Sequence, residues 1–555
     1  MKKYIVALIG AFFSMSLVAD TLPDLHRPLD IPAVLSGNFG ELRSNHFHSG
    51  IDFKTQGRTG FDIHSAEDGY VSRVTVSPWG FGRAVYIVHP SIGLTTVYGH
   101  LESFATKIDT IIKNEQYRIE QFSVDMTFEP NEIPVNRGEI IAKSGNSGSS
   151  GGPHLHMDVR ETATGDALDP MPYFKSLLAD NIAPQFSGLA LYPQFGVVDG
   201  DVIAAYRTTS DYNIPFKAWG KVVPAIRAND KMTGTTNVYG VKYLTLFVDG
   251  RKVYERIIDR VDFNETRAIN SIVDYRDRVK KNRWYMTTRI PANNRLDYMI
   301  KTDSCYGVLD INEERDYKCR YELSDEHGNK KTIHFVIKGE YSEIPDKEYE
   351  GVLFHFDIDN TYRDSLITVT LPQYSLYDNM FFNVVADSSS KFYSPIFSVG
   401  DVGVPLHHSF EMRVSLNKDT IGDKGKYCLV RLNGNKKSAM SSRYENGTIV
   451  AKSNRFGRYA VTVDTIAPKV TLVNTVKWGT SGRIRVKIAD NLSGIENYRG
   501  EVDGKFVLLE YDGKNAMLSY RLDKTRVKRG IMHTFEIVVT DACGNITRQA
   551  HRFKW

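Results

Sequence analysis

Two histidines, His154 and His156, flank a single Leu in the stretch "GGPHLHMDVR", directly after a run of Gly and Ser residues. In an extended strand alternate side chains lie on one face, so both imidazoles and the Asp158 carboxylate point the same way. The small residues before them allow a close backbone approach and leave space for a long substrate. This spacing favours a shared ligand, although alternating histidines also occur on solvated strand faces.

A second stretch, "HFHSGIDF", places His48 and Asp52 four positions apart with Gly50 between them. The glycine lets the chain turn, so an imidazole and a carboxylate can reach one point. Imidazole nitrogen and carboxylate oxygen are ordinary zinc ligands, and three protein ligands leave a fourth position for water. The alternative for this stretch alone is a surface His and a turn-forming Asp. In a third stretch, "VYGHLESF", His100 stands where a strand gives way to a loop.

The elements that must position these residues read as short strands between Gly turns. From about residue 32 to 170 the segments alternate β-branched and aromatic residues, which predicts an antiparallel β domain. No helical periodicity is evident before "MPYFKSLL" at residues 171–178. Residues 103–135 interrupt the pattern as an insertion, which could form a flap beside the site or extend the sheet. The predicted strands are "GYVSRVTVS", "RAVYIVHP", "LTTVYGHL", "GEIIAKSG" and "HLHMDVR".

Three motifs in this order, "HSGID", "YGHL" and "GNSGSSGGPHLH", resemble the signature of the LytM/lysostaphin-type zinc endopeptidases. The resemblance spans about residues 38–170, includes "FDIHSAEDGYVSRV" and "GEIIAKSGNSG", and replaces none of the signature positions. It implies an antiparallel β peptidase domain. The long segment after His100 departs from the family pattern, which leaves substrate range and access open but not the chemistry.

Carried over position by position, the resemblance implies that His48, Asp52 and His156 bind one Zn²⁺ and that His100 and His154 are catalytic. Such a zinc ion lowers the pKa of a bound water from 15.7 toward about 7 and polarises a substrate carbonyl. One free histidine, His154 in the first assignment, takes the proton from that water. The other then hydrogen-bonds the oxyanion or protonates the leaving amine, and the sequence leaves this division of roles open.

Asp158 has two readings that the sequence does not separate. On the same strand face as the two histidines, its carboxylate could hold an imidazole N–H in support of the metal site. It could equally be a plain surface acid.

The C-terminal two thirds contain a duplicated module. Asp-Gly and Gly-Asn turn elements between strands predict a β-sandwich of immunoglobulin-like type for each copy, residues 179–340 and 464–555. Residues 341–463 are strand-rich, match neither copy, and form a third β domain of unassigned type. Four pairs of motifs recur in the same order: "DNIAP" and "DTIAP", "NDKMTG" and "ADNLSG", "VDGRKV" and "VDGKFV", "SDEHGN" and "TDACGN".

The beginning of the chain predicts export. Residues 1–19 contain two lysines, an apolar run and small residues, as in a cleaved secretory signal, and the apolar run is too short to span a bilayer. The peptidase domain then covers residues 20–178. A formal charge of +4 gives no reason to expect a nucleic-acid partner. Of the four cysteines only Cys305 and Cys319 are close in sequence, and whether they are bridged is left open.

These observations together predict an exported zinc endopeptidase of the periplasm or cell envelope that hydrolyses peptide bonds in peptidoglycan stem peptides or cross-links. Two alternatives stand beside it: a non-catalytic activator of a cell-wall amidase, and a zinc protease of extracellular proteins. After signal cleavage no stable membrane span is expected. The C-terminal β domains are expected to bind envelope partners or act as spacers, unless one of them folds back over the groove as an inhibitor.

Overall fold

The computed structural model describes residues 22–555, so the predicted signal segment, residues 1–19, lies outside the described part. Strands dominate this part, and three α-helices accompany them. The expected mainly β fold is therefore confirmed. Within residues 22–555 no helix has both the length and the apolar character needed to cross a bilayer.

The N-terminal domain is built on one antiparallel sheet in the order β1-β4-β13-β8-β7-β6-β10. Its two central strands, β13 and β8, are buried along most of their length, as their position requires. All five segments predicted as strands form strands. The elements of this sheet are β1 (Leu35–Gly37), β4 (Ile51–Lys54), β6 (Gly69–Val76), β7 (Arg83–His89), β8 (Leu94–Gly99), β10 (Val124–Thr127) and β13 (His154–Glu161). A smaller sheet contains β5 (Asp62–His64), β12 (Ile140–Lys143) and β9 (Ser103–Phe104).

The insertion at residues 103–135 contains a helix, α1 (Thr106–Ile119), so the expectation of no helix before residue 171 was wrong. Ile108, Ile112 and Gln116 are buried at intervals of four, which places them on one helix face. The same insertion also extends the main sheet, because β10 pairs with β6. The segment "MPYFKSLL" forms a 3₁₀ helix, η1 (Met171–Leu177), rather than an α-helix.

The first copy of the duplicated module is continuous with the N-terminal domain. The two share one hydrophobic core, and β14 (Ala167–Leu168) pairs with β20 (Arg260–Val261) across the boundary. Its strands form one sheet because the 14-residue β17 pairs with β15 along its length and with β25 at its start. The elements are β15 (Gln185–Val198), β16 (Ala205–Thr208), β17 (Phe216–Asn229), β18 (Tyr243–Val248), β19 (Arg251–Ile257), α2 (Tyr275–Lys281), β22 (Ile300–Thr302), β24 (Asp316–Ser324) and β25 (Lys330–Gly339).

The middle domain is a sandwich of two five-stranded sheets around its own core. One sheet contains β27 (Asn360–Arg363), β28 (Ile367–Leu371), β32 (Phe410–Ser415), β35 (Ser442–Glu445) and β36 (Thr448–Ser453). The other contains β30 (Val384–Asp387), β31 (Ile396–Val399), β33 (Tyr427–Asn433), β34 (Lys436–Ala439) and β37 (Gly457–Val463).

The last domain has two four-stranded sheets that enclose a separate core. One sheet contains β38 (Lys469–Leu472), β39 (Arg483–Ala489), β42 (Glu510–Asp512) and β43 (Met517–Arg521), with α3 (Trp478–Ser481) between β38 and β39. The other contains β40 (Ile495–Val502), β41 (Lys505–Val507), β44 (Met532–Asp541) and β45 (Ile546–Lys554).

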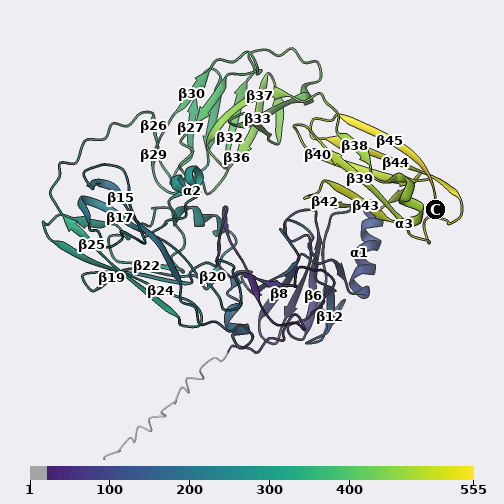
Figure 1. Cartoon of the computed structure of the whole chain (residues 1–555). Helices are drawn as coiled ribbons and strands as arrows, with labels where there is room; N and C mark the ends of the chain where they lie inside the picture. Colours follow the sequence, from purple (N-terminus) through teal and green to yellow (C-terminus); the bar gives the residue numbers. More distant parts are fainter. Residues whose placement is uncertain (1–21) are drawn as a thin grey trace, which may run out of the picture.

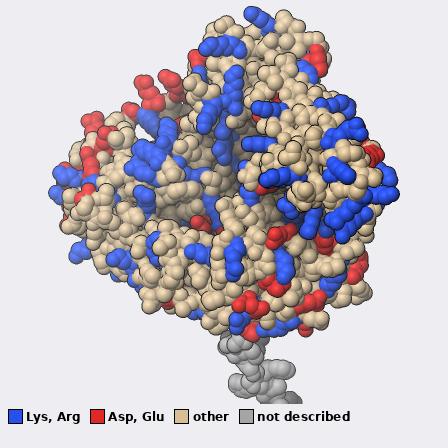
Figure 2. Space-filling view, turned by 45° about the vertical axis from the view of Figure 1, so that its right-hand side comes forward, with Lys and Arg blue, Asp and Glu red and all other residues tan. Residues whose placement is uncertain are grey.

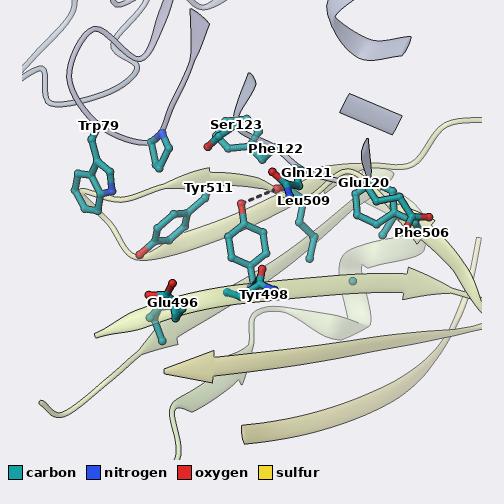
Figure 3. A pocket seen from close by; sticks show the side chains of 15 residues that line it. Trp79, Glu120, Gln121, Phe122, Ser123, Glu496, Tyr498, Phe506, Leu509 and Tyr511 are labelled. Atoms are coloured by element: carbon teal, nitrogen blue, oxygen red, sulfur yellow. Dashed lines mark hydrogen bonds between the residues drawn. The ribbon is translucent and has the colours of Figure 1, made fainter. Parts of the chain in front are cut away.

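The last domain returns to the N-terminal domain, so the four parts of the chain form a ring (Figure 1). Arg83 at the start of β7 pairs with Glu510 at 3.0 Å, and Trp79 packs edge-on against Tyr511. Figure 3 shows the cavity of about 500 Å³ between the two domains, with Trp79 and Phe122 on one side and Tyr498 and Tyr511 on the other. Figure 2 shows a hollow in one face of the molecule with Lys and Arg side chains around it.

Candidate metal centre

Strand pairing brings two of the predicted ligands face to face. His156 on β13 lies directly opposite Asp52 on the neighbouring β4, so both side chains leave the sheet on the same face. His48 lies in the segment between β3 (His46–Phe47) and β4. Gly50 of the same segment packs against the Met157 carbonyl. A Cβ at Gly50 would lie 2.3 Å from that oxygen, so the close approach of the turn to β13 requires a glycine.

Three side-chain atoms of the predicted ligands meet at one point. His48 Nε2 lies 3.1 Å from Asp52 Oδ1 and 3.0 Å from His156 Nδ1. His156 Nδ1 lies 2.9 Å from the same Asp52 oxygen. All three side chains are buried, with residue exposures of 2 to 5%. The structure thus brings together residues that are separated by up to 108 positions in sequence.

The outer atoms of these side chains have partners that fix which atoms face inward. His48 Nδ1 donates to the Asn38 carbonyl at 2.7 Å, and His156 Nε2 donates to Asp158 Oδ1 at 2.6 Å. Both inner nitrogens therefore direct lone pairs at the common point. Arg43 donates to Asp52 Oδ2 at 2.7 Å, which leaves Oδ1 for the centre.

Three ligand atoms that converge on one point favour a cation between them, and the donor set fits zinc. Two neutral imidazoles and a carboxylate are an ordinary zinc ligand set. In a tetrahedral site with bonds of about 2.1 Å neighbouring ligand atoms lie roughly 3.4 Å apart, so the observed separations need to widen only slightly. Burial opposes protonation of His156, but Asp158 and Asp52 raise its pKa to about 9, so a proton and a metal compete for this place.

The two other predicted histidines face the same point from above the sheet. His100 follows β8 with a left-handed φ of +62° and donates from Nδ1 to the Ser147 carbonyl at 2.9 Å. His154 donates from Nδ1 to the Gly152 carbonyl at 2.8 Å, and its Nε2 lies 3.5 Å from Asp52 Oδ1. The two imidazole rings lie 4.7 Å apart. Because Nδ1 of each ring is held by a backbone carbonyl, Nε2 is the nitrogen of each that can exchange a proton with a bound molecule.

Burial and the neighbouring imidazoles lower the pKa of His100 to about 3, so this ring is neutral at physiological pH. A neutral ring can accept a proton or donate one hydrogen bond according to its tautomer. The Nδ1–H bond to Ser147 assigns the proton to Nδ1 and leaves Nε2 as the acceptor.

Asp158 is fully buried and is not a surface acid. Besides His156 it accepts from Ser49 Oγ at 3.0 Å and from two nitrogens of Arg160. Burial alone would raise the pKa of Asp158, but the charges of Arg160 and His156 outweigh burial and lower this pKa to about 2. The ionised carboxylate therefore orients the ring of His156.

Several residues around the centre were not found by sequence reasoning. Arg160 lies two positions beyond Asp158 on the same strand face, so the alternation could have revealed it. Arg43, at the end of a two-residue strand, and Asn38 and Phe81, in loops, carry no local signal of their role; the Phe81 ring stacks 4.8 Å from His156. Their contacts depend on pairing between distant strands.

A family model for a Zu5-like domain matches residues 351–464. All of these residues but the last lie within the range that the sequence left as a β domain of unassigned type, and they contain both five-stranded sheets.

Among curated proteins, an "Uncharacterized metalloprotease" of Haemophilus influenzae is 31% identical to this chain over 124 residues, 22% of this chain and 20% of the relative. The match thus spans about a fifth of that relative's length. Among solved structures, the chain is similar to the catalytic domain of the prophage-encoded M23 protein EnpA from Enterococcus faecalis, at 27% identity over 25% of this chain and 89% of that one, with a TM-score of 0.19. It is also similar to the catalytic domain of the antimicrobial peptidase lysostaphin from Staphylococcus simulans, at 21% identity over 26% of this chain and 92% of that one, with a TM-score of 0.20. The resemblance of the N-terminal domain to the LytM/lysostaphin-type peptidases is confirmed.

Proposed function

We propose that this chain, with an N-terminal domain of the LytM/lysostaphin type, is an exported zinc endopeptidase that hydrolyses peptide bonds in peptidoglycan stem peptides or cross-links. The observation that carries the proposal is the meeting of His48 Nε2, Asp52 Oδ1 and His156 Nδ1 at one point, all three as acceptors. Two further imidazoles, His100 and His154, face that point.

In this proposal His48, Asp52 and His156 hold Zn²⁺, which supplies a Lewis acid that activates water and polarises a carbonyl. Their outer partners keep the ligand atoms in place before substrate arrives, since Asn38, Arg43 and Asp158 fix each side chain.

His154 is placed to take a proton at Nε2, because its Nδ1–H is already held by the Gly152 carbonyl. His100 faces the same space with Nε2 and is held by the Ser147 carbonyl. After His154 or His100 has accepted a proton, its Nε2–H can donate to the developing oxyanion or to the leaving amine. In this proposal both rings have this capacity, and the kinetics of single variants separate their roles.

The substrate class rests on the LytM/lysostaphin resemblance together with the predicted export signal. The retention of all five polar residues supports an enzyme over a non-catalytic activator of an amidase, because an activator has no need of them. Export to the periplasm or envelope is part of the proposal.

The test is digestion of defined muropeptides and intact sacculi by the full chain, followed by mass spectrometry of the released fragments. We expect new amino and carboxyl termini within stem peptides or cross-links, loss of activity with 1,10-phenanthroline, and recovery with added zinc. Cleavage of protein substrates alone would favour a protease of extracellular proteins. A lack of any hydrolysis, with zinc bound, would contradict the peptidase assignment.

A further inference from the structure

Two of the four cysteines meet at the junction between the middle and last domains. Cys428 lies on β33 of the middle domain and Cys543 in the turn between β44 and β45 of the last domain. Both are buried, at 3% and 7% exposure, in one small apolar cluster with Val430. The two side chains pack in this cluster closely enough that each thiol shifts the pKa of the other. Cys305, by contrast, is exposed, and Cys319 is buried in β24.

The turn that carries Cys543 is a docking element in both copies of the duplicated module. In the first copy the turn "DEHGN" places His327 against the preceding domain, where its Nε2 bonds to the Leu178 carbonyl at 2.5 Å. In the second copy "DACGN" places Cys543 at the same position. The structure therefore assigns this position to contact with the domain before it.

Both turns are fixed by matching hydrogen bonds, so the contact residue has little freedom. The Asn329 side chain donates to the Asp180 carbonyl at 3.4 Å, and Asn545 donates to the Asp464 carbonyl at 3.0 Å. In the second copy Lys426 of the middle domain also donates to the Cys543 carbonyl at 2.8 Å. These hydrogen bonds fix the position of the Cys543 backbone relative to the middle domain.

We propose that Cys428 and Cys543 form a disulfide that joins the middle domain to the last domain. Bond formation needs a disulfide-bearing oxidant, a small-molecule disulfide or a thiol–disulfide exchange protein. The Cys543 thiolate attacks one sulfur of that disulfide and releases one thiol. The Cys428 thiolate then attacks the Cys543 sulfur of this mixed disulfide, which forms the Cys428–Cys543 bond and releases the other half of the oxidant as a second thiol. The two protein thiols lose two electrons and two protons, and the oxidant becomes two thiols.

The local environment favours Cys543 as the attacking group. The Cys428 thiol lowers the pKa of Cys543, whereas the Cys543 thiol and burial raise the pKa of Cys428. A thiolate is the nucleophile in this exchange. Because both sulfurs are buried in the finished fold, the bond forms while the junction closes.

Bond formation inside the cell rests on export, which is part of the proposed function, because disulfides persist in oxidising compartments. The geometry of the pair does not rest on it. The bond would fix the orientation of the last domain, which contacts the N-terminal domain through Arg83 and Glu510.

The experiment is refolding of the denatured, reduced full chain in a buffer of oxidised and reduced glutathione, alkylation of remaining thiols under denaturing conditions, and tryptic digestion without reductant. We expect a linked pair of peptides, residues 427–431 and 530–548, which reductant separates. We also expect reduction to lower the melting temperature of the oxidised chain by on the order of 5 °C. Recovery of alkylated Cys428 and Cys543 from the oxidised chain would overturn the proposal.

Two variants complete the test. Cys428→Ser should abolish the linked pair and the effect of reductant on melting, whereas the double variant Cys305→Ser, Cys319→Ser should keep both. Retention of the reductant effect in Cys428→Ser would overturn the proposal by a second route. The readouts are peptide mass and melting temperature, so they do not depend on zinc or hydrolysis. A linked pair in a chain that cleaves no peptide would sink the proposed function alone.

Discussion

His154 and His156 leave the same strand face, yet only His156 reaches the point shared with His48 and Asp52. In the proposed function this step of two residues along the strand separates a zinc ligand, His156, from a proton-transfer group, His154. We expect His156→Ala to lose both zinc and activity. His154→Ala should retain zinc and lose on the order of 10²–10⁴ in rate, the usual contribution of acid–base catalysis. Zinc content by mass spectrometry and kcat on a muropeptide check both; tight zinc binding by His156→Ala would refute the ligand set.

Asp158 extends the same logic one residue further along the strand. Its ionised carboxylate holds the outer N–H of His156 and is itself held by Arg160. We expect Asp158→Asn to weaken zinc binding by about 10- to 100-fold, because the amide holds the ring less strongly. Competition with a chromophoric chelator measures this affinity. The control is Asp125→Asn, which removes a carboxylate paired with Arg73 on the exposed side of the sheet and should leave zinc affinity unchanged.

Spacing two on a strand drew attention to His154 and His156, and spacing four around a glycine to His48 and Asp52, but the predicted roles of these residues and of His100 came from the resemblance to the LytM/lysostaphin-type peptidases. Their meeting could not be worked out from that spacing, since it depends on the register of β13 with β4. The supporting residues Asn38 and Arg43 show no local sequence pattern. Asn38 contacts His48 through its backbone carbonyl, and Arg43 contacts Oδ2 of Asp52, the oxygen that faces away from the centre.

At the scale of elements, only some glycines of the stretch before His154 lie in close contact with another part of the backbone. Gly148 has a φ of +69°, and a Cβ there would lie 2.3 Å from the Gly82 nitrogen. Gly151 has no atom within 4 Å of such a Cβ. The contact joins the loop that holds His100 to the hairpin between β6 and β7.

We expect Gly148→Ala to lower kcat/KM at least tenfold, because the added methyl group displaces the loop whose Ser147 carbonyl holds His100. Gly151→Ala is the matched control and should stay near the parent value. Steady-state kinetics with zinc content measured in parallel provide the check. Equal activity of the two variants would show that the loop tolerates this displacement.

The helix α1 shows where sequence reasoning failed at this scale. Its apolar positions, Ile108 and Ile112, are few, and the third buried position is Gln116, whose side chain bonds to the Phe122 carbonyl. A polar residue in the buried stripe obscured the helical period. The strands were easier, because alternation of β-branched residues with turn glycines is a local property.

The stability of the first copy of the duplicated module is expected to depend on pH through one buried carboxylate, Asp230. Asp230 is 4% exposed, and burial, with the charges of Asp325 and Asp180, raises its pKa to about 8. Between the ordinary pKa near 4 and this value the folded state holds a proton that the unfolded state has lost, so stability falls as pH rises through that window. We therefore expect Asp230→Asn to raise the melting temperature by a few degrees at pH 8.5, and by less as the pH falls toward 4. A lower melting temperature for Asp230→Asn at pH 8.5 would mean that a bound cation compensates the carboxylate.

For the whole molecule, the peptidase domain is not an independent unit. Its core is continuous with that of the first copy of the duplicated module, and the Asn38 side chain exchanges two hydrogen bonds with Gly240 while its carbonyl holds His48. A chain ending near residue 178 would lose this support, so its activity would report on folding as well as on any inhibitory contact. The role of the last domain is better tested by changing single residues at its contact.

The last domain touches the loop that holds His100. Lys514, in the turn between β42 and β43, donates to the Asn146 carbonyl, and the next residue, Ser147, accepts from His100. Glu510 from the same hairpin pairs with Arg83, whose backbone N–H bonds to Ser147 Oγ. The hairpin therefore holds the loop from two sides.

If this contact supports the loop, Lys514→Ala should lower kcat about fivefold, since a net hydrogen bond contributes about 1 kcal/mol and zinc remains bound. If the domain instead covers the groove as an inhibitor, the same change should raise kcat/KM. We expect the decrease, because Lys514 holds the Asn146 carbonyl and the neighbouring Ser147 carbonyl orients His100. Kinetics of Lys514→Ala beside Lys469→Ala, an exposed lysine of the same domain, separate the two outcomes. A rise in activity confined to Lys514→Ala would establish the inhibitory reading.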